Sequence, residues 1–364
     1  MKATHTLIFV LYDGIENSVF QSQVLFPLMQ MIEKNDEQEI IVISFEHYKI
    51  SDQKLIKLIP PHERMHIIIC RKMPFFGKVS LLFAAYQFKN FLKKFSGNEI
   101  IARGPLAGFI VLHALHALIP KQLNAARYAD SPLVTIQARG LCAQEYRYAH
   151  KTHWNSFFKK YWHRFIFTQL DHIEEFVFGG PCERDIFPLT IEAVSPALKQ
   201  YLIEHWHADA VRIVLATRDV PPPIIPEQIA LWKLEVRKEL GIPSDAVVYC
   251  YSGSFKPWQC AQESIDYFLE QYKKDSISFM LVLSQDRELF KRLLEKSNLS
   301  QKQYVVMYVS AQKLYRYLSA ADFGLLFREP DIINWVSRPT KMLEYQAVGL
   351  KIIHNDTIAL LAKN

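Results

Sequence analysis

The chain has 364 residues, of which half are hydrophobic and 22% are charged, with a formal net charge of +6. This length allows two domains with substantial cores, and the composition is ordinary for a soluble globular protein. The positive charge is mild and spread along the chain, so it fits anionic ligands or membrane surfaces and gives no reason to expect nucleic acid. The five cysteines form no CxxC pair, which favours reduced thiols in a cytosolic protein.

Neither of the most apolar runs predicts a membrane-spanning helix. The first run ends at the charged Asp13 and is followed by no small-residue cleavage site, so we interpret it as a β-strand and not as a signal peptide. The second, Ile100 to Ile119, contains Arg103, Gly104 and Pro105 and predicts a strand, a loop and a helix.

Apolar strands alternate with helical patterns through the first half of the chain, which predicts a parallel α/β sheet. The predicted strands are Thr6–Leu11, Ile40–Phe45, His66–Cys70, Glu99–Ala102, Leu133–Gln137 and Ile191–Val194. The predicted helices include Ser22–Lys34, Val79–Lys94, Leu106–Leu118 and Ser195–His205.

The loop after the first strand lies where a Rossmann-like domain meets its ligand. Gly14 permits a tight turn there, and Asn17 or Ser18 can cap the next helix. The loop is not a GxGxxG motif and predicts no dinucleotide. A plain turn accounts for it equally well.

Two strands of the first half end in Ala-Arg-Gly, at Arg103-Gly104 and Arg139-Gly140. Because parallel strands end at the same edge of a sheet, we expect these arginines to point into one cleft, with Glu145 close by. Each arginine could instead only pair with a nearby carboxylate.

Residues Lys151 to Thr168 are basic and aromatic and include no acid. At helical spacing one stripe contains Trp154, Phe158, Tyr161, Trp162 and Phe165. The pattern fits a helix packed on the sheet, and it also fits an interfacial helix on an anionic membrane. RNA binding lacks any supporting module signature.

A proline-rich segment, 218–230, predicts a stiff linker that divides the chain into residues 1–217 and 231–364. Before it, Ser195 is a good N-cap with Pro196 at the first helical position. No G-x-S-x-G surrounds Ser195, so we do not expect a nucleophile there.

The second domain begins with a predicted helix (Gln228–Leu240) and a strand (Ala246–Tyr251), followed by the strands Phe279–Leu283 and Tyr304–Tyr308. The loop after its first strand contains Gly253, where the backbone can approach a ligand, and Ser254 and Lys256 supply a donor and a positive charge.

A βαβ unit closes the chain: strand Phe323–Phe327, helix Thr340–Val348, a stop at Gly349 and strand Leu350–His354. Free amides at the helix start, together with cationic side chains, predict a phosphate site. A carboxylate in the same place can hold a pair of sugar hydroxyls, so the edge suits a nucleotide diphosphate. Its polar residues are Arg328, Glu329, Asn334, Ser337, Arg338, Thr340, Lys341 and Glu344.

The residue pattern of this unit resembles the donor site of retaining glycosyltransferases of the GT-B fold that belong to the large family 4. Their "aD-G-L" strand is followed by "P-K-x-x-E-Y-x-A-x-G-x-P-V-I", and their first domain has a "V-S-x-A-L" that is similar to Val194–Leu198. The matching residues here are Ala321, Asp322, Gly324, Leu325, Pro339, Lys341, Glu344, Tyr345, Ala347, Gly349 and Lys351-Ile352-Ile353.

The resemblance implies two Rossmann-like domains facing a cleft, and transfer of a sugar with retention from a nucleotide-diphosphate donor to an acceptor hydroxyl. No cofactor besides the nucleotide sugar and no metal are expected. By this resemblance the catalytic residues are Arg139, Glu145 and Arg328; the donor site is Gly253, Ser254, Lys256, Ser337, Thr340, Lys341 and Glu344; and the acceptor site is Asn17, Ser18, Arg103, Gly104 and Gly140.

By family association the acceptor is a saccharide or a lipid-linked saccharide. The product is then a bacterial surface polysaccharide or glycolipid, and the protein is cytoplasmic or peripheral on the inner face of the membrane.

The sequence departs from the family pattern in three places. Val336 stands where most members have a second glutamate, Ser254 stands where an arginine is usual, and the chain ends at Asn364, so the second domain is expected to be shortened. These departures leave open a catalytically inactive module that binds a partner or a membrane. A nucleotide-sugar epimerase of the same fold is a further alternative.

Overall fold

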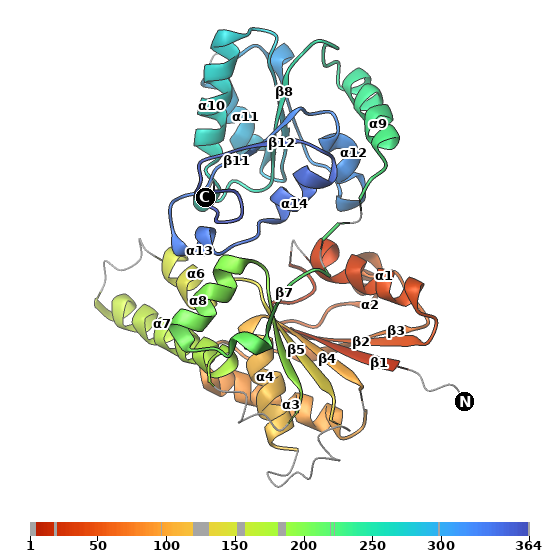
Figure 1. Ribbon diagram of the computed structural model, residues 1–364, viewed down its shortest axis with the longest axis vertical. Coiled ribbons are helices and arrows are strands. Elements are labelled where there is room, and N and C mark those ends of the chain that lie inside the picture. Colours follow the sequence, from red (N-terminus) through yellow and green to blue (C-terminus); the bar gives the residue numbers. More distant parts are fainter. Residues whose placement is uncertain are drawn as a thin grey trace. The chain divides into compact units, whose positions relative to one another are not determined.

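The computed structural model describes residues 5–17, 20–95, 97–118, 131–150, 157–180, 187–218, 220–221, 223–297 and 299–362. The chain divides into two compact units, Met1–Asp219 and Val220–Asn364, each with its own parallel sheet (Figure 1). Ser18, a predicted acceptor residue, lies outside the described residues, as does the segment 151–156 of the predicted basic helix.

Unit 1 contains a seven-stranded sheet within the described residues, in the order β3-β2-β1-β4-β5-β6-β7, and all its neighbours pair in parallel. The central strands are apolar on both faces because helices cover both sides. The strand bounds are β1 His5–Leu11, β2 Gln38–Glu46, β3 Met65–Arg71, β4 Glu99–Arg103, β5 Leu133–Ala138, β6 Leu189–Ala193 and β7 Ile213–Leu215.

The six predicted strands of this half are confirmed, whereas β7 and the helix α2 were not predicted. Strand β7 has three residues, of which only Ile213 is buried. Its apolar pattern is therefore too short to predict a strand from the sequence. The helix bounds are α1 Phe26–Lys34, which continues a π-helical turn at Gln21–Leu25, α2 Asp52–Leu58, α3 Lys78–Leu92, α4 Gly104–His116, α6 Cys142–Ala149, α7 Phe157–Phe178 and α8 Pro196–Trp206.

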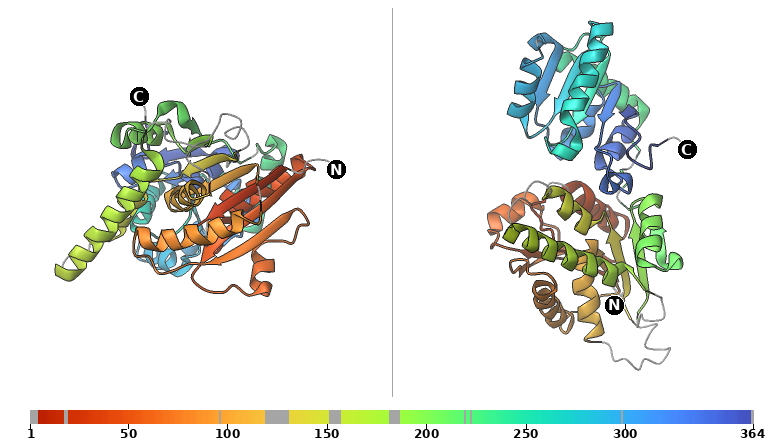
Figure 2. Two further views of the ribbon diagram at one scale, coloured as in Figure 1. Left: turned by 90° about the horizontal axis from the view of Figure 1, so that it is seen from below. Right: turned by 90° about the vertical axis from the view of Figure 1, so that its left-hand side faces the viewer.

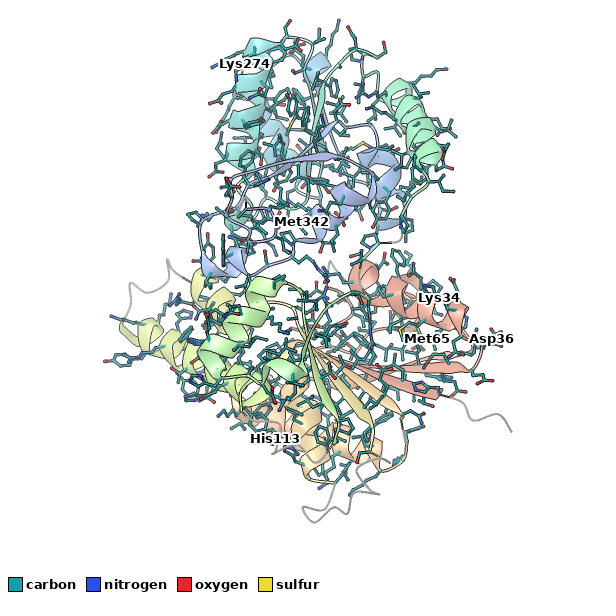
Figure 3. The ribbon with its side chains drawn as sticks, in the orientation of Figure 1. Lys34, Asp36, Met65, His113, Lys274 and Met342 are labelled. Carbon is teal, nitrogen blue, oxygen red and sulfur yellow. The ribbon has the colours of Figure 1, made fainter. Side chains whose placement is uncertain are left out.

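Helix α4 lies between the sheet and the neighbouring helices α3 and α7, which explains why it is apolar on nearly every side. His113 of α4 is labelled in Figure 3, and its ring stacks on Phe176 of α7 with ring centroids 4.7 Å apart. Helix α7 runs ten residues past the predicted end at Thr168, because Leu170, Ile173 and Val177 continue its buried face beneath charged neighbours.

Unit 2 contains a five-stranded parallel sheet within the described residues, in the order β10-β9-β8-β11-β12. The prediction for β9 is confirmed residue for residue, and the others differ by one or two residues at their ends. The strand bounds are β8 Val248–Ser252, β9 Phe279–Leu283, β10 Tyr304–Met307, β11 Phe323–Leu326 and β12 Lys351–His354.

The helices of unit 2 surround this sheet in Figures 1 and 2. Helix α9 begins at Pro226, inside the segment predicted as linker, because proline is well suited to the first turn of a helix. The helix bounds are α9 Pro226–Glu239, α10 Ala261–Lys274, α11 Arg287–Glu295, α12 Leu314–Leu318, α13 Ile332–Trp335 and α14 Thr340–Ala347.

Two predicted local features take the expected form. The Ser195 hydroxyl caps α8 by accepting a hydrogen bond from the Leu198 N–H at 3.0 Å. Gly349 ends the turn after α14 with φ +73, a left-handed conformation that glycine adopts without strain. No helix among the described residues has both the length and the apolar character needed to span a bilayer.

Candidate donor site at the carboxyl edge of the unit 2 sheet

Strands β8 and β11 are neighbours, so the loops that follow Ser252 and Leu326 leave the same edge of the sheet side by side. Helix α14 begins beside them, held by Tyr345. The Tyr345 hydroxyl accepts a hydrogen bond from the Ser252 N–H at 3.0 Å, and a Cβ on Gly324 would collide with the Tyr345 ring. The two motif residues Gly324 and Tyr345 therefore act together, and their packing brings the start of α14 to β8.

Gly253 and Lys341 meet at this edge. Gly253 has φ +129, and its N–H donates to the Leu283 carbonyl at 2.9 Å. A Cβ on Gly253 would collide with Cε of Lys341 and lie 2.7 Å from its Nζ. The glycine predicted to let the backbone approach a ligand thus also makes room for the Lys341 side chain.

Lys341 is a buried cation. Its residue is 7% exposed, and its Nζ has no hydrogen-bond partner within the described part of the chain. The Nζ lies 4.0 Å from the centroid of the Tyr251 ring. Burial lowers the pKa of Lys341 well below its usual value, the neighbouring Arg328 lowers it further, and Glu344 acts in the opposite direction. An ammonium without hydrogen-bond partners is unfavourable in such a place, so an anion that accepts hydrogen bonds from Lys341 would stabilise the site.

Arg328 is the second buried cation of the site. It is 7% exposed, and burial lowers the pKa of its guanidinium. Its backbone is fixed by Asn355, whose Nδ2 donates to the Arg328 carbonyl at 2.7 Å and whose Oδ1 accepts from the Arg328 N–H at 3.2 Å. The arginine is consequently positioned by the strand ends and not by a carboxylate.

Glu344 follows Lys341 by three residues on α14 and is partly buried. Burial raises the pKa of its carboxyl to about 7, and the nearby Lys341 offsets part of that rise. A carboxylate here can accept two hydrogen bonds from adjacent hydroxyl groups.

The other predicted donor residues lie in the loop after β8 and at the approach to α14. The Ser254 carbonyl accepts from the Tyr251 hydroxyl at 2.8 Å, and the exposed Lys256 places its Nζ 5.2 Å from the Trp258 ring centroid. The Ser337 hydroxyl donates to the Asn334 carbonyl at 2.8 Å, and Thr340 is the first residue of α14.

Val336, which replaces the second glutamate of the family pattern, is 1% exposed. It ends the short helix α13, and the Trp335 carbonyl beside it accepts from the Ala359 N–H at 3.1 Å. An apolar side chain at this position packs into unit 2 and supplies no carboxylate to a ligand.

The predicted convergence of the two arginines in unit 1 is confirmed. Strands β4 and β5 are neighbours, and Nη2 of Arg103 and Nη2 of Arg139 both donate to Oε1 of Gln23, at 2.5 and 3.0 Å. The Arg103 Nε also lies 3.6 Å from Asp13 Oδ2, which accepts from the Asn17 side chain at 3.1 Å. Gln23 was missed, because a single glutamine at a helix start carries no sequence signal.

Gly104 and Gly140 follow these arginines as predicted. Gly104 has φ +78 and begins α4, with no atom within 4 Å of where a Cβ would stand. A Cβ on Gly140 would collide with Oε1 of Glu145, so the glycine lets this carboxylate lie against the loop.

Glu174 of α7 is a buried carboxyl that sequence reasoning missed. It is fully buried, and it accepts from the Cys142 N–H at 2.6 Å and from the Ala143 N–H at 3.3 Å. Burial raises its pKa to about 8, and the hydrogen bonds from Cys142 and Ala143 act against the rise. Glu174 thereby positions the start of α6 and the loop that contains Arg139.

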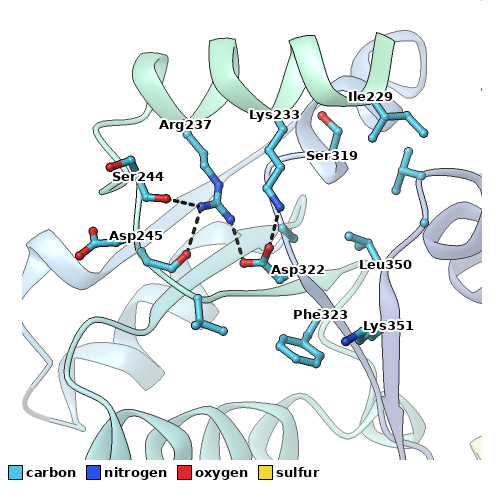
Figure 4. Close-up of a pocket in the computed structure, with 15 residues that line it drawn as sticks. Ile229, Lys233, Arg237, Ser244, Asp245, Ser319, Asp322, Phe323, Leu350 and Lys351 are labelled. Carbon is cyan, nitrogen blue, oxygen red and sulfur yellow. Dashed lines mark hydrogen bonds and ion pairs between the residues drawn. The ribbon is translucent and has the colours of Figure 1, made fainter. Parts of the chain in front are cut away.

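A pocket of about 620 Å³ lies at the opposite, amino-terminal end of the unit 2 strands (Figure 4). Three of its charged groups pair with one another: Asp322 pairs with Arg237 at 2.8 Å and with Lys233 at 2.6 Å, and accepts from the Val248 N–H at 2.8 Å. Burial favours a higher Asp322 pKa, but the hydrogen bond from Lys233, the Val248 amide and Arg237 lower it. We therefore assign this cluster to sheet stability. The described residues form no group of three or more His, Cys, Asp or Glu suited to a metal ion.

No family model matches the sequence, and no curated protein matches it. The fold does match solved structures at low identity. Sucrose-phosphate synthase from Thermosynechococcus elongatus aligns with a TM-score of 0.65 and 14% identity, over 98% of this chain and 82% of that chain. WaaG, a glycosyltransferase involved in lipopolysaccharide biosynthesis, aligns with a TM-score of 0.61 and 14% identity, over 98% and 82%.

Anabaena HepE, solved with UDP and glucose, aligns with a TM-score of 0.57 and 12% identity, over 96% of this chain and 80% of that chain. A UDP-N-acetylglucosamine 2-epimerase from Listeria monocytogenes also aligns, with a TM-score of 0.53 and 10% identity, over 97% and 79%. The prediction of two Rossmann-like α/β domains is confirmed, because each unit has a parallel sheet with alternating helices that matches these solved structures. At these identities the comparisons establish the fold alone.

Proposed function

We propose that this protein is a retaining glycosyltransferase, similar to family 4 of the GT-B fold, that uses a nucleotide-diphosphate sugar as donor. The observation that carries the proposal is the buried Lys341, whose Nζ has no hydrogen-bond partner in the described structure and lies next to Arg328 and the Gly253 loop. Two buried cations beside one partly buried carboxyl are unfavourable until an anion joins them.

A diphosphate is the anion that fits these groups best. It has enough oxygens to accept from Lys341, from Arg328 and from amides at the start of α14 together. Glu344, one turn further along α14, is then placed to accept hydrogen bonds from the two ribose hydroxyls. In this proposal Ser254, Lys256, Ser337 and Thr340 complete the donor site.

In the proposed reaction the bond between the sugar's anomeric carbon and the diphosphate breaks, and the acceptor oxygen bonds to that carbon on the same face. The departing diphosphate takes up the acceptor's proton and gains negative charge in the transition state. Lys341 and Arg328 stabilise that charge from fixed positions, which is the largest contribution expected of such a site.

Unit 1 supplies the acceptor groups in this proposal. Arg103 and Arg139 lie together at Gln23, and Glu145 lies against Gly140 in the next loop. These groups suit a saccharide or a lipid-linked saccharide that carries hydroxyls and negative charge. We place the reaction in bacterial surface polysaccharide or glycolipid synthesis, in the cytoplasm or at the inner face of the membrane.

Two alternatives stay open. An inactive GT-B module is favoured by the buried Val336 and by Ser254 in place of an arginine. A nucleotide-sugar epimerase would need a histidine and carboxylates at the sugar ring. An epimerase and a transferase would both bind the nucleotide, so only the transfer of sugar to an acceptor distinguishes them.

The first test is calorimetric binding of a panel of nucleoside diphosphates to the wild type and to Glu344→Ala, with Glu288→Ala on the exposed face of α11 as the matched control. The proposal expects one nucleotide to bind tightly, to bind the control equally and to be lost in Glu344→Ala. No binding by any nucleotide would favour the inactive module. Equal binding by Glu344→Ala would remove the ribose role assigned to Glu344.

A further inference from the structure

Two stretches of unit 1, far apart in the sequence, contain basic residues and no acidic ones. Between Glu63 and Glu99 there are seven Lys or Arg residues and no Asp or Glu. Between Glu145 and Asp171 there are five Lys or Arg residues and again no Asp or Glu. The first stretch includes α3, and the second includes the first half of α7.

The structure brings these stretches together. The Phe76 ring meets the Trp162 ring edge to face, with centroids 6.0 Å apart. The Lys78 N–H donates to Oε1 of Gln169 at 3.3 Å, and a Cβ on Gly77 would collide with the same glutamine. Both helices also pack on α4 (Figures 1 and 2). The start of α3 therefore lies against α7, and we call the exposed faces of these two helices the α3–α7 surface.

This α3–α7 surface exposes large apolar and aromatic side chains. On α3 they follow helical spacing, so they form one stripe on the side away from the buried Leu81, Ala84 and Phe88. Isolated exposed apolar residues are ordinary on a protein, but a contiguous group marks an interaction site. The exposed residues are Phe76, Val79, Leu82, Phe83, Tyr86, Tyr161, Trp162 and Phe165.

The charges on this surface indicate what covers it. Lys159, Lys160 and Arg164 are exposed on α7 beside Tyr161 and Trp162, and no acid within either stretch neutralises them. Aromatic rings flanked by lysine and arginine are suited to the boundary between lipid headgroups and acyl chains. The cations add attraction to anionic headgroups and exclude a basic partner.

We propose that α3 and α7 together form a docking surface for a bilayer that contains anionic phospholipid. The basic-aromatic segment that begins before α7 suggests such a role by itself, and α3 adds its own stripe of exposed apolar side chains. The same helix α7 holds the loop of Arg139 through Glu174. Docking through this surface would bring a lipid-linked acceptor to the Arg139 loop. That step rests on the proposed function, whereas the proposal of a docking surface is independent of it.

The test is co-sedimentation of the purified full chain with vesicles of phosphatidylcholine, alone or mixed with phosphatidylglycerol. One variant, Lys159→Gln/Lys160→Gln, removes charge, and another, Leu82→Ser/Tyr86→Ser, removes the apolar stripe. The matched controls in unit 2 are Lys273→Gln/Lys274→Gln at the end of α10 and Leu231→Ser/Leu234→Ser on α9, all at exposed positions.

The wild type and both controls are expected to bind the mixed vesicles and to bind phosphatidylcholine alone weakly. The lysine variant should lose about 30-fold in partitioning, because each cation near an anionic surface is worth about 1 kcal/mol. The apolar variant should lose binding to both kinds of vesicle, with its melting temperature unchanged.

The proposal would be overturned if the wild type bound neither kind of vesicle, or bound both kinds equally. It would also be overturned if the lysine variant bound as well as its control. A dimer in light scattering that Leu82→Ser/Tyr86→Ser dissociates would assign the surface to a second copy instead. Nucleoside diphosphate binding measured without vesicles should be the same in all variants. If the wild type did not bind any nucleoside diphosphate, the donor site would be contradicted, but the docking surface would not be affected.

Discussion

The ammonium of Lys341 lies 4.0 Å from the centroid of the Tyr251 ring and has no hydrogen-bond partner in the described residues. A cation over a desolvated aromatic ring gains on the order of 2 kcal/mol, which is less than the cost of removing an ammonium from water. An unpaired ammonium at this position is therefore unfavourable, and an anion beside it would lower the cost. The first two predictions below follow from this imbalance.

Replacing Lys341 by Met should weaken nucleoside diphosphate binding and stabilise the ligand-free protein. Loss of a charge-assisted hydrogen bond predicts about 10- to 100-fold weaker binding. Removal of a buried, unsatisfied charge predicts about 1 kcal/mol or more of added stability. Calorimetry and denaturant unfolding measure the two effects. Lys351→Met, at the amino-terminal end of β12, is the control and should change neither, while unaltered affinity in Lys341→Met would contradict the assignment.

Nucleotide affinity should depend on the ionisation of Glu344. Burial raises its pKa to about 7, so in the free protein the carboxylate that holds ribose is lost as pH falls through that value. Affinity should fall with it, by up to about tenfold per pH unit. Glu344→Gln should bind the nucleotide weakly, and its affinity should change less with pH, because only the phosphate groups of the nucleotide still titrate. Calorimetry at pH values on both sides of this pKa measures both profiles. Parallel profiles for the two proteins would exclude the carboxylate from the site.

Gly324→Ala should destabilise unit 2 because the new Cβ collides with the Tyr345 ring. Overpacking of this kind costs about 1–3 kcal/mol, and here it also displaces the hydroxyl that accepts from the Ser252 N–H. The cost should shrink in a Tyr345→Leu background, where the ring is absent. Denaturant unfolding of the four proteins of this double-mutant cycle measures the coupling, and additive effects would show that the ring is not responsible.

The stability of unit 1 should fall as pH rises from about 4.5 to about 8. Glu174 has its folded-state pKa raised to about 8 by burial, against 4.5 in the unfolded chain. Between these values the folded state binds more protons than the unfolded state, so unfolding becomes easier with each pH unit and levels off above the folded pKa. Glu174→Gln should remove this slope, which unfolding curves across the range would reveal. A slope that survives the substitution would assign it to other groups.

The strands and helices around the donor site could be predicted from local pattern. Apolar runs without alternation identified β9, β11 and β12, and the spacing of Thr340, Lys341 and Glu344 placed them on one helix start. Hydrophobic periodicity and turn residues act over a few neighbours, and these elements depend on little else.

Predictions were less accurate where packing overrides local pattern. The acid-free segment suggested a helix ending at Thr168, yet α7 continues to Phe178 because its buried face extends beneath Asp171 and Glu175. Gln23 and Glu174 carry no motif at all. Their roles come from groups brought to them by the fold: two arginine side chains for Gln23, and the amides at the start of α6 for Glu174.

The sequence by itself determined the α/β class, the position of the last βαβ unit and the residue types at its edge, because each depends on periodicity and spacing within a short stretch. Only the tertiary structure decided that Lys341 is buried with no hydrogen-bond partner among the described residues, that Gly253 gives its side chain room, and that the start of α3 lies against α7. Burial, and with it a shifted pKa, depends on which distant segments share an edge or a face, and chain folding alone sets that.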